Sequence, residues 1–113
     1  MSYSKYHAKK TTVDGIVFDS KREAKRYLTL KEKQEKGEIT DLEMQKEYLL
    51  IPSQKDKKTG KTIERPVKYR ADFVYKTADG KEVVEDVKGK RLAEYIIKRK
   101  LMLWIHGIKI EEI

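Results

Sequence analysis

Two extended runs joined by a short turn constrain the fold of this chain more than any other feature. Val67–Lys76 and Lys81–Lys88 alternate apolar with polar residues and are rich in Val, Tyr and Phe. The four residues between them end in Asp79-Gly80, a dipeptide typical of tight turns. The pattern predicts a β-hairpin, and the remaining segments must pack around it.

The length of the turn decides which side chains of this hairpin face each other. A two-residue loop would set Asp86 opposite Phe73. A three-residue loop, with Gly80 in the left-handed conformation, sets Asp86 opposite Asp72 instead. We favour the second register because it separates charged from apolar side chains, and a slip of one residue would mix them. Its one misfit is Glu85, which falls opposite Phe73.

The favoured register predicts a cation site. Directly opposed residues have Cβ atoms roughly 4.5–5.5 Å apart, so the carboxylates of Asp72 and Asp86 would repel unless a cation lay between them or one were protonated. A divalent metal ion is the simplest solution, and the main-chain carbonyl of Val87 would add a third hard oxygen ligand of the kind Mg²⁺ prefers. Lys88 follows on the same face and could orient an attacking water. The alternative is a surface cluster of cross-strand charges, which would contribute little.

Composition indicates a polyanionic partner. The 113 residues suit one domain, residues 1–113, and 41% of them are charged, with a net charge of +8. A basic compact domain points to nucleic acid, although lysine-rich surfaces also serve solubility alone. The absence of cysteine and the wide separation of His7 from His106 argue against a zinc site. No apolar run approaches membrane-spanning length and the N-terminus lacks a secretory pattern, so we expect a cytoplasmic protein with no membrane partner.

The other elements can be predicted from periodicity and punctuation. In order, we expect a basic N-terminal arm over about residues 1–10, a small hairpin (Thr11–Val13 and Ile16–Phe18), a helix (Lys21–Lys36), a short connection at Ile39 and Leu42, a strand (Lys46–Ile51), a basic loop or hairpin tip over about residues 54–65, the central hairpin, a helix (Leu92–His106) and a last strand from Ile108. A strand, a helix and a further strand suggest a right-handed crossover, which would place the last strand parallel to Val83–Lys88.

Glu23 has two interpretations. Ser20-Lys21-Arg22-Glu23 reads as a capping box, in which the Glu23 carboxylate would bond the main-chain N–H of Ser20. Alternatively, this carboxylate turns toward the aspartate pair and takes part in catalysis. Spacing alone favours the cap.

Three blocks of the sequence together resemble a known superfamily. They are Phe18-Asp19-Ser20-Lys21-Arg22-Glu23-Ala24 continuing to Tyr27, then Tyr69-Arg70-Ala71-Asp72-Phe73, then Glu85-Asp86-Val87-Lys88-Gly89. The combination resembles the PD-(D/E)xK nucleases, and more closely a family of small phage and prophage proteins within them. It is similar, more distantly, to the end-cutting endonuclease subunit of some bacterial transposons.

The resemblance implies an α/β fold with a restriction-endonuclease-like α-β-β-β-α-β core, a mixed sheet flanked by helices. It also implies hydrolysis of DNA phosphodiesters with Mg²⁺ or Mn²⁺, with Glu23, Asp72 and Asp86 as acids of the metal site and Lys88 as the catalytic lysine. Ala71 stands where the superfamily often has proline. Glu85 could replace Asp86 as the second acidic ligand if the strand were bulged; alternation with Lys88 favours Asp86.

These observations predict a metal-dependent DNA endonuclease that processes phage DNA or its recombination intermediates, branched DNA included. Its location would be the cytoplasm of a bacterial host, and double-strand cutting would ask for a homodimer. The alternatives are a non-catalytic nucleic-acid-binding module on a nuclease fold and an RNA-directed nuclease. The residues expected to contact nucleic acid are Lys5, Tyr6, His7, Lys9, Lys10, Arg22, Lys90, Arg91 and Lys98.

Overall fold

A computed structural model describes residues 10–87 and 91–113. Its elements, in chain order, are β1 (Thr11–Val13), β2 (Ile16–Phe18), α1 (Lys21–Glu35), β3 (Ile39–Met44), β4 (Glu47–Ile51), β5 (Gln54–Lys55), β6 (Thr62–Glu64), β7 (Val67–Arg70), β8 (Phe73–Thr77), β9 (Glu82–Asp86), α2 (Ala93–His106) and β10 (Glu111–Glu112).

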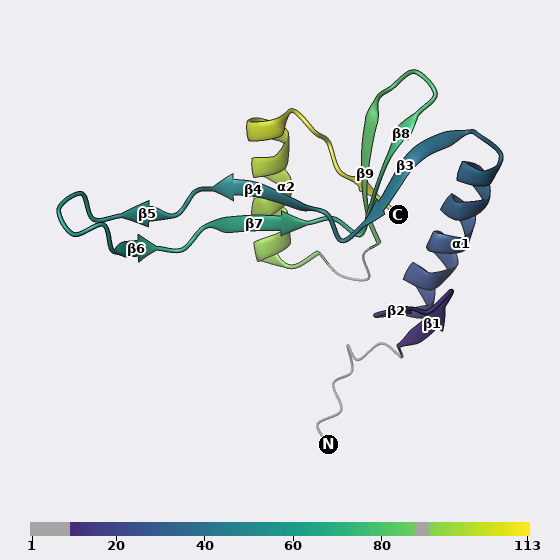
Figure 1. The fold of residues 1–113 in the computed structure, drawn as a ribbon, viewed down its shortest axis with the longest axis horizontal. Helices are drawn as coiled ribbons and strands as arrows, with labels where there is room; N and C mark the ends of the chain where they lie inside the picture. The colour runs from purple at the N-terminus through teal and green to yellow at the C-terminus, as the bar shows by residue number, and fades with distance from the viewer. Residues whose placement is uncertain (1–9, 88–90) are drawn as a thin grey trace.

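A four-stranded mixed sheet forms the centre, with strand order β10-β9-β8-β3 (Figure 1). Strands β3, β8 and β9 are antiparallel neighbours, and β10 lies parallel to β9, as the predicted crossover requires. Without β1, β2 and the β4–β7 segment, the order is α1, β3, β8, β9, α2, β10. The predicted α/β class, with a mixed sheet and two helices, is therefore confirmed.

The two helices pack against different hydrophobic clusters of the described residues. α1 buries Ala24, Tyr27 and Leu30 against Phe73 and Tyr75 of β8. α2 buries Tyr95 and Met102 in a second cluster, with Val74 of β8, Val84 of β9 and Tyr69 of β7. Since neighbouring residues of a strand point to opposite faces, Val74 and Tyr75 place the helices on opposite sides of the sheet.

Both helices begin and end close to where the sequence predicts. The Oγ of Ser20 accepts a hydrogen bond from the Glu23 main-chain N–H at 3.1 Å, which caps the start of α1. Gly107 ends α2 in the left-handed conformation, with φ of 67°, and its N–H bonds the Leu103 carbonyl. No helix among the described residues is long and apolar enough to cross a membrane.

The register of the central hairpin agrees with the three-residue turn. Val74 pairs with Val84, Lys76 pairs with Glu82, and Phe73 pairs with Glu85. The turn closes with the Thr77 N–H on the Lys81 carbonyl, and Gly80 has φ of 84°. The misfit of Glu85 opposite Phe73 is therefore a real feature of the protein.

The prediction of a single strand over Val67–Lys76 was wrong. The chain changes partners at Ala71-Asp72: the Ala71 N–H bonds the Lys46 carbonyl, whereas the next N–H, that of Asp72, bonds the Glu85 carbonyl. β7 consequently pairs with β4, and only β8 pairs with β9. The predicted pairing of Asp72 with Asp86 lies beyond the end of this ladder, which stops at Phe73 and Glu85.

The segment at Ile39 and Leu42 was predicted as a connection, and this was also wrong. It is strand β3, an edge strand of the central sheet that pairs with β8. Its register shifts between Thr40 and Glu43, and Asp41 has a φ of 56°. The irregularity interrupts the apolar alternation, which explains why the sequence pattern did not indicate a strand.

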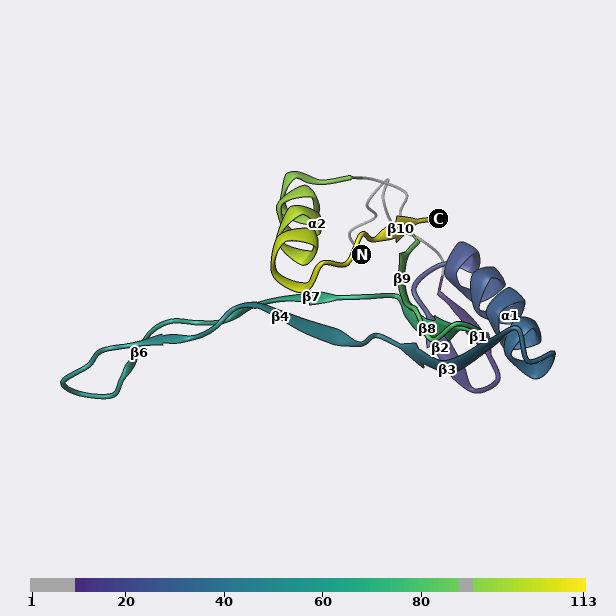
Figure 2. The same cartoon turned by 90° about the horizontal axis from the view of Figure 1, so that it is seen from above.

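Beyond the sheet, β4 with β7 and β5 with β6 form one extended two-stranded ribbon, called here the ribbon (residues 47–70). Figures 1 and 2 show it projecting from the body along the longest dimension of the molecule, which measures 54 Å. Its root packs on α2, where a His106 ring nitrogen lies 2.8 Å from the Leu49 carbonyl. The predicted basic loop at residues 54–65 is the outer part of this ribbon.

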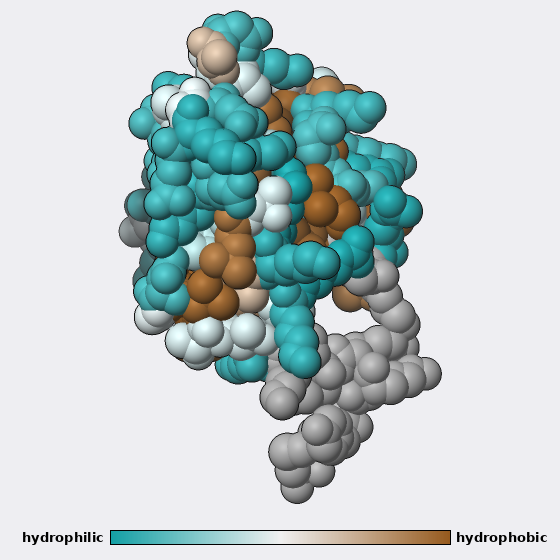
Figure 3. Space-filling view, turned by 90° about the vertical axis from the view of Figure 1, so that its right-hand side faces the viewer, coloured by the Kyte–Doolittle hydropathy of each residue, from teal (hydrophilic) through white to brown (hydrophobic). Residues whose placement is uncertain are grey.

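The opposite end of the molecule, seen in Figure 3, is hydrophilic over most of its surface, with hydrophobic side chains in separate patches. Val17 of β2 and Leu28 of α1 are among the exposed apolar residues. On α2, Ile97 and Trp104 are exposed as well. A homodimer stays a prediction.

Candidate metal and phosphodiester site

Asp72 lies at the point where the chain passes from the ribbon into the sheet. Its main-chain carbonyl accepts a hydrogen bond from the main-chain N–H of Gln45, and Gln45 has a φ of 59°. The connection between β3 and β4 and the connection between β7 and β8 therefore bend at the same level. Its carboxylate Oδ2 accepts the main-chain N–H of Val87 at 2.7 Å. A side-chain oxygen thus takes the place of a ladder hydrogen bond, and this fixes the carboxylate at the end of β9.

Asp86 is the last residue of β9 and is 2% exposed. Its Oδ2 accepts a hydrogen bond from the Tyr69 hydroxyl at 2.6 Å. Its main-chain carbonyl accepts the N–H of Ile113, which follows β10. Neighbours on both sides therefore hold Asp86, with its carboxylate on the α2 side of the sheet.

The two aspartates lie at the same end of the hairpin. Asp86 ends β9, and the Asp72 carboxylate is held by the N–H of the next residue, Val87. Burial raises the pKa of Tyr69 above its ordinary value, the hydrogen bond to Asp86 raises it further, and the negative charge of Asp86 adds to the effect. That the two carboxylates share one side of the hairpin and hold one cation stays a prediction.

Glu85, the alternative acidic ligand, lies on the other side of the sheet. It is 1% exposed, and its two carboxylate oxygens accept hydrogen bonds from Nε and Nη2 of Arg26 at 2.7 and 2.6 Å. The Tyr75 hydroxyl donates a third bond at 2.5 Å. This bidentate ion pair raises the pKa of Arg26 and ties α1 to the sheet. Glu85 is therefore committed to Arg26 and Tyr75 on the α1 side of the sheet, whereas Asp86 bonds Tyr69 on the α2 side.

Glu23 lies in the first turn of α1 and is half-buried. Its main-chain N–H donates to Ser20 Oγ, which is the serine half of the predicted capping box. The bond from the Glu23 carboxylate to the Ser20 N–H stays a prediction. Among residues 10–87 and 91–113, no three Asp, Glu or His side chains form a group that could hold a metal ion. The role of Glu23 as a third acidic ligand stays a prediction.

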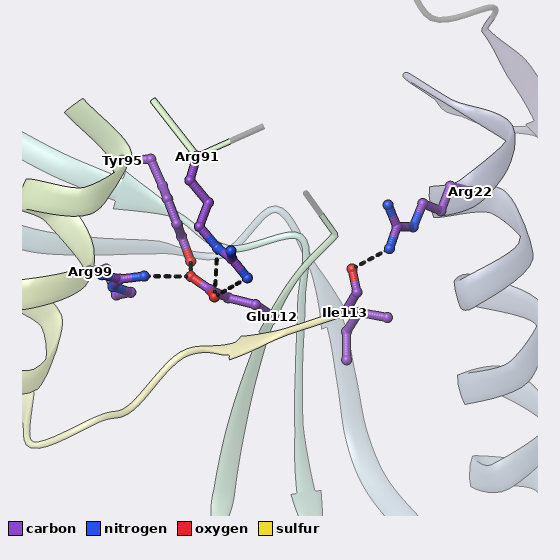
Figure 4. Close-up of polar contacts among 6 residues, drawn as sticks. All are labelled: Arg22, Arg91, Tyr95, Arg99, Glu112 and Ile113. Atoms are coloured by element: carbon purple, nitrogen blue, oxygen red, sulfur yellow. Dashed lines mark hydrogen bonds and ion pairs between the residues drawn. The ribbon is translucent and has the colours of Figure 1, made fainter. Parts of the chain in front are cut away.

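A third carboxylate lies beside Asp86. Glu112 pairs with Asp86 across the parallel β9–β10 ladder, and its oxygens accept hydrogen bonds from Arg91, Tyr95 and Arg99 at 2.7–3.0 Å (Figure 4). These donors lower the pKa of Glu112 from 4.5 to about 2, with Tyr95 contributing most. The network fastens the C-terminal strand to α2.

The residues predicted to contact nucleic acid are in different situations. Outside the described residues lie Lys5, Tyr6, His7, Lys9 and Lys90, and so does Lys88, the predicted catalytic lysine. Arg91 pairs with Glu112, Lys98 lies 3.5 Å from Glu94, and Arg22 donates to the Ile113 carbonyl, as Figure 4 shows. These contacts would have to yield before the three side chains could bind phosphate. Lys10 is exposed.

Sequence reasoning assigned no part in the site to Tyr69, nor any specific contact to Arg26. Tyr69 stands three residues before Asp72, and the break between β7 and β8 turns its hydroxyl toward Asp86. The signal for Arg26 was present: a glutamate opposite phenylalanine in a sheet must find a donor elsewhere, and α1 supplies it. A groove of about 650 Å³ lies on this side, lined by Arg26, Tyr75 and Glu85 among others, and neither Asp72 nor Asp86 lines it.

The fold and this arrangement define a mixed α/β protein with two aspartates at one end of its central hairpin, one just before β8 and one at the end of β9. The chain belongs to the family described as Protein of unknown function (DUF1064), whose model matches residues 3–108. The matched segment contains Glu23, Asp72, Asp86 and Lys88, and it ends before Glu112. Neither the curated proteins nor the solved structures contain a match to the chain.

Proposed function

We propose that this protein is an Mg²⁺- or Mn²⁺-dependent DNA endonuclease of the PD-(D/E)xK type, which hydrolyses phosphodiester bonds during the processing or recombination of phage DNA. One observation carries the proposal. Asp72 and Asp86 lie together at the end of β9, where the Val87 N–H holds the carboxylate of Asp72 and the Tyr69 hydroxyl holds that of Asp86. The three sequence blocks that resemble the nuclease superfamily supply the reaction class.

The donor set suits a hard divalent cation. Two carboxylates and the Val87 carbonyl are all oxygen ligands, and Mg²⁺ is often held by one or two carboxylates while keeping several waters and binding substrate phosphates. The absence of a group of three acids among the described residues is compatible with such a site. The Tyr69 hydroxyl orients the Asp86 carboxylate and the Val87 N–H orients that of Asp72, in the way that supporting hydrogen bonds orient metal ligands.

In the proposed reaction, water adds across one phosphodiester. A bond forms between the water oxygen and phosphorus while the bond from phosphorus to one sugar oxygen breaks, and the products are a phosphomonoester and a hydroxyl. The cation, when bound, would neutralise charge on the phosphate and lower the pKa of a water. The protein's part is to hold the cation through Asp72 and Asp86, and to orient the water through Lys88, which lies outside the described residues.

Nucleolytic assays test this proposal directly. The full chain is incubated with supercoiled, nicked, linear and four-way DNA in Mg²⁺ or Mn²⁺, beside Asp72→Asn, Asp86→Asn and Lys88→Ala. Asp19→Asn, at an exposed aspartate before α1, is the matched control. We expect each of the three site variants to lose about 100-fold or more in rate and to bind DNA about as tightly as the parent. Cutting by Asp72→Asn at the parental rate would overturn the assignment.

A non-catalytic binding module is the second candidate, because the same basic surface, in a chain of net charge +8, would bind nucleic acid without hydrolysing it. Titration calorimetry with Mn²⁺ separates the two. Binding that Asp86→Asn removes supports the nuclease, whereas no heat at millimolar Mn²⁺ supports the module. Matched DNA and RNA substrates in the same assays test the RNA-directed alternative.

A further inference from the structure

The outer part of the ribbon, residues 51–66, contributes no side chain to the hydrophobic clusters of the described residues. From Ile51 to Pro66 every residue is exposed except Asp56, which is half-buried. The main-chain pairing of β5 with β6 and the turn at the tip hold this part in shape. A segment that buries so little and still extends far from the body needs another reason for its length.

The tip of the ribbon is a defined turn. Oδ1 of Asp56 accepts the N–H groups of Lys58 and Thr59 at 2.8 and 3.0 Å. The Asp56 N–H bonds the Lys61 carbonyl, and Gly60, with φ of 76°, bonds back to the Asp56 carbonyl. These bonds lower the pKa of Asp56, which keeps its carboxylate ionised as the acceptor. Lys57 and Lys58 are thereby presented at the outer end.

Positive charge is concentrated on this segment. Between Ile51 and Pro66 there are five cations and two carboxylates, a net charge of +3 in a chain of +8. The cations are Lys55, Lys57, Lys58, Lys61 and Arg65. Within the part of the chain that the structure describes, none of these five forms an ion pair, whereas Arg26, Lys31, Arg91 and Arg99 of the body all do.

The ribbon is joined directly to the candidate site. β7 runs from the outer part to Arg70, and Asp72 follows after one residue. At about 3.3 Å per residue, the stretch from Lys58 to Arg70 reaches roughly 40 Å, which fits the longest dimension of 54 Å. One turn of B-DNA measures roughly 34–36 Å. The tip can therefore reach a duplex slightly more than one helical turn from a phosphate held at Asp72.

We propose that the outer ribbon, residues 51–66, is a second DNA-binding element, which contacts the backbone and major groove of duplex DNA about one helical turn from the phosphate at the Asp72–Asp86 site. The inference rests on the proposed function and adds a substrate requirement to it: duplex DNA that continues past the cutting site. A two-stranded β-ribbon fits the major groove of B-DNA, while the major groove of A-form RNA is too deep and narrow. Duplex DNA is thus the partner that this shape favours.

The test compares two variants of equal charge. Lys55, Lys57, Lys58 and Lys61 are replaced by Ser in the ribbon variant; Lys25, Lys33, Lys100 and Lys109, which form no described ion pair, are replaced by Ser in the control variant. Fluorescence anisotropy in EDTA measures binding to 8-bp and 30-bp duplexes over a range of salt, and melting curves check that both variants fold.

We expect the ribbon variant to lose roughly 10- to 100-fold in affinity for the 30-bp duplex and to reduce the slope of log K against log salt by about 3. For the 8-bp duplex, which is shorter than one helical turn of about 34–36 Å and ends before the tip, both variants should bind alike. In hydroxyl-radical footprinting, the parental protein should protect a second patch about one turn from the cut.

Equal behaviour of the ribbon and control variants on the long duplex, or a footprint confined to the cutting site, would overturn this inference while leaving the endonuclease intact. If the ribbon variant lost as much affinity for A-form RNA as for the 30-bp DNA duplex, the ribbon would bind polyanions in general, and the preference for duplex DNA would be wrong. If the parental protein neither cuts nor binds DNA, the proposed function fails first.

Discussion

Glu85 and Asp86 are neighbours on β9, almost equally buried at 1% and 2% exposure, and they lie on opposite faces of one sheet. On the α1 face, Glu85 meets a guanidinium in a bidentate pair and the Tyr75 hydroxyl. On the α2 face, Asp86 accepts a hydrogen bond from the Tyr69 hydroxyl, and a second acid, Asp72, bonds the N–H of the next residue, Val87. The two carboxylates are similarly buried, and the charged groups around them differ.

The charged groups around a buried carboxylate indicate whether it has a structural or a functional role. A carboxylate neutralised by arginine already has its stabilising charge inside the fold, so it serves as a tie between elements. A carboxylate beside another carboxylate, held in place by a hydroxyl, keeps negative charge concentrated at one spot. The second arrangement suits a cation that arrives from outside, and the predictions below test this distinction.

The largest effect should come from breaking the ion pair on the α1 face. Arg26→Met leaves Glu85 buried without its cation, which should cost about 3 kcal/mol in the free energy of unfolding. Urea denaturation followed by circular dichroism measures it. Lys25→Met, the exposed neighbour on α1, should change stability by less than about 0.5 kcal/mol.

A double variant, Arg26→Met with Glu85→Gln, sharpens this result because it removes the stranded charge. We expect it to recover part of the stability lost by Arg26→Met alone. If the single Arg26 variant is as stable as the parent, Glu85 is not held as a structural tie and the comparison between the faces loses its basis.

The next effect compares the two tyrosines. Tyr69→Phe and Tyr75→Phe each remove the hydroxyl that donates a hydrogen bond to one buried carboxylate. Each should lower the free energy of unfolding by about 1 kcal/mol. Only Tyr69 orients a proposed metal ligand, so Tyr69→Phe should weaken Mn²⁺ binding about tenfold or more, as loss of a supporting hydrogen bond typically does.

Calorimetric titration with Mn²⁺ measures this difference, and Tyr75→Phe is the matched control, expected to bind within about threefold of the parent. The same loss in both variants would mean that general loosening of the sheet, and no specific support of Asp86, governs the affinity.

The sequence predicted most of the hairpin and both helices because each rests on local rules. Asp79-Gly80 selected the turn, and Ser20 and Gly107 mark helix ends through their own backbone chemistry. The break at Ala71-Asp72 could not be predicted, since Tyr69, Ala71 and Phe73 alternate without interruption. The strand breaks because the Ala71 N–H bonds the Lys46 carbonyl whereas the Asp72 N–H bonds the Glu85 carbonyl. These two acceptors are far apart in sequence, so local patterns do not indicate the break.

The candidate site was predictable to a similar limit. Alternation placed Asp86 and Glu85 on opposite faces, but it could not supply the partner that each would meet. Arg26 reaches Glu85 only because α1 packs on that face, and Tyr69 reaches Asp86 only because β7 leaves the sheet. Long-range packing therefore decides which acid is neutralised.

Glu112 gives the comparison its most demanding test, because it lies on the same face as Asp86 and next to it in the ladder, yet Arg91, Arg99 and Tyr95 surround its carboxylate. If the charged partners of a carboxylate, rather than the face of the sheet on which it lies, decide whether it binds metal, Glu112→Gln should leave Mn²⁺ affinity within about threefold of the parent. The same substitution should lower the free energy of unfolding by about 1 kcal/mol at pH 7. The pKa of Glu112 is lowered from 4.5 to about 2 in the fold, so its contribution is present in full above pH 4.5 and disappears as the pH falls through 2. Urea midpoints at pH 7, 5 and 3 should therefore show the gap between parent and variant narrowing toward acid. A tenfold loss of Mn²⁺ affinity would place Glu112 with Asp86 in the metal site and show that arginine partners do not exclude a carboxylate from it. A stability gap that stays constant with pH would mean that ionisation of Glu112 does not contribute to stability.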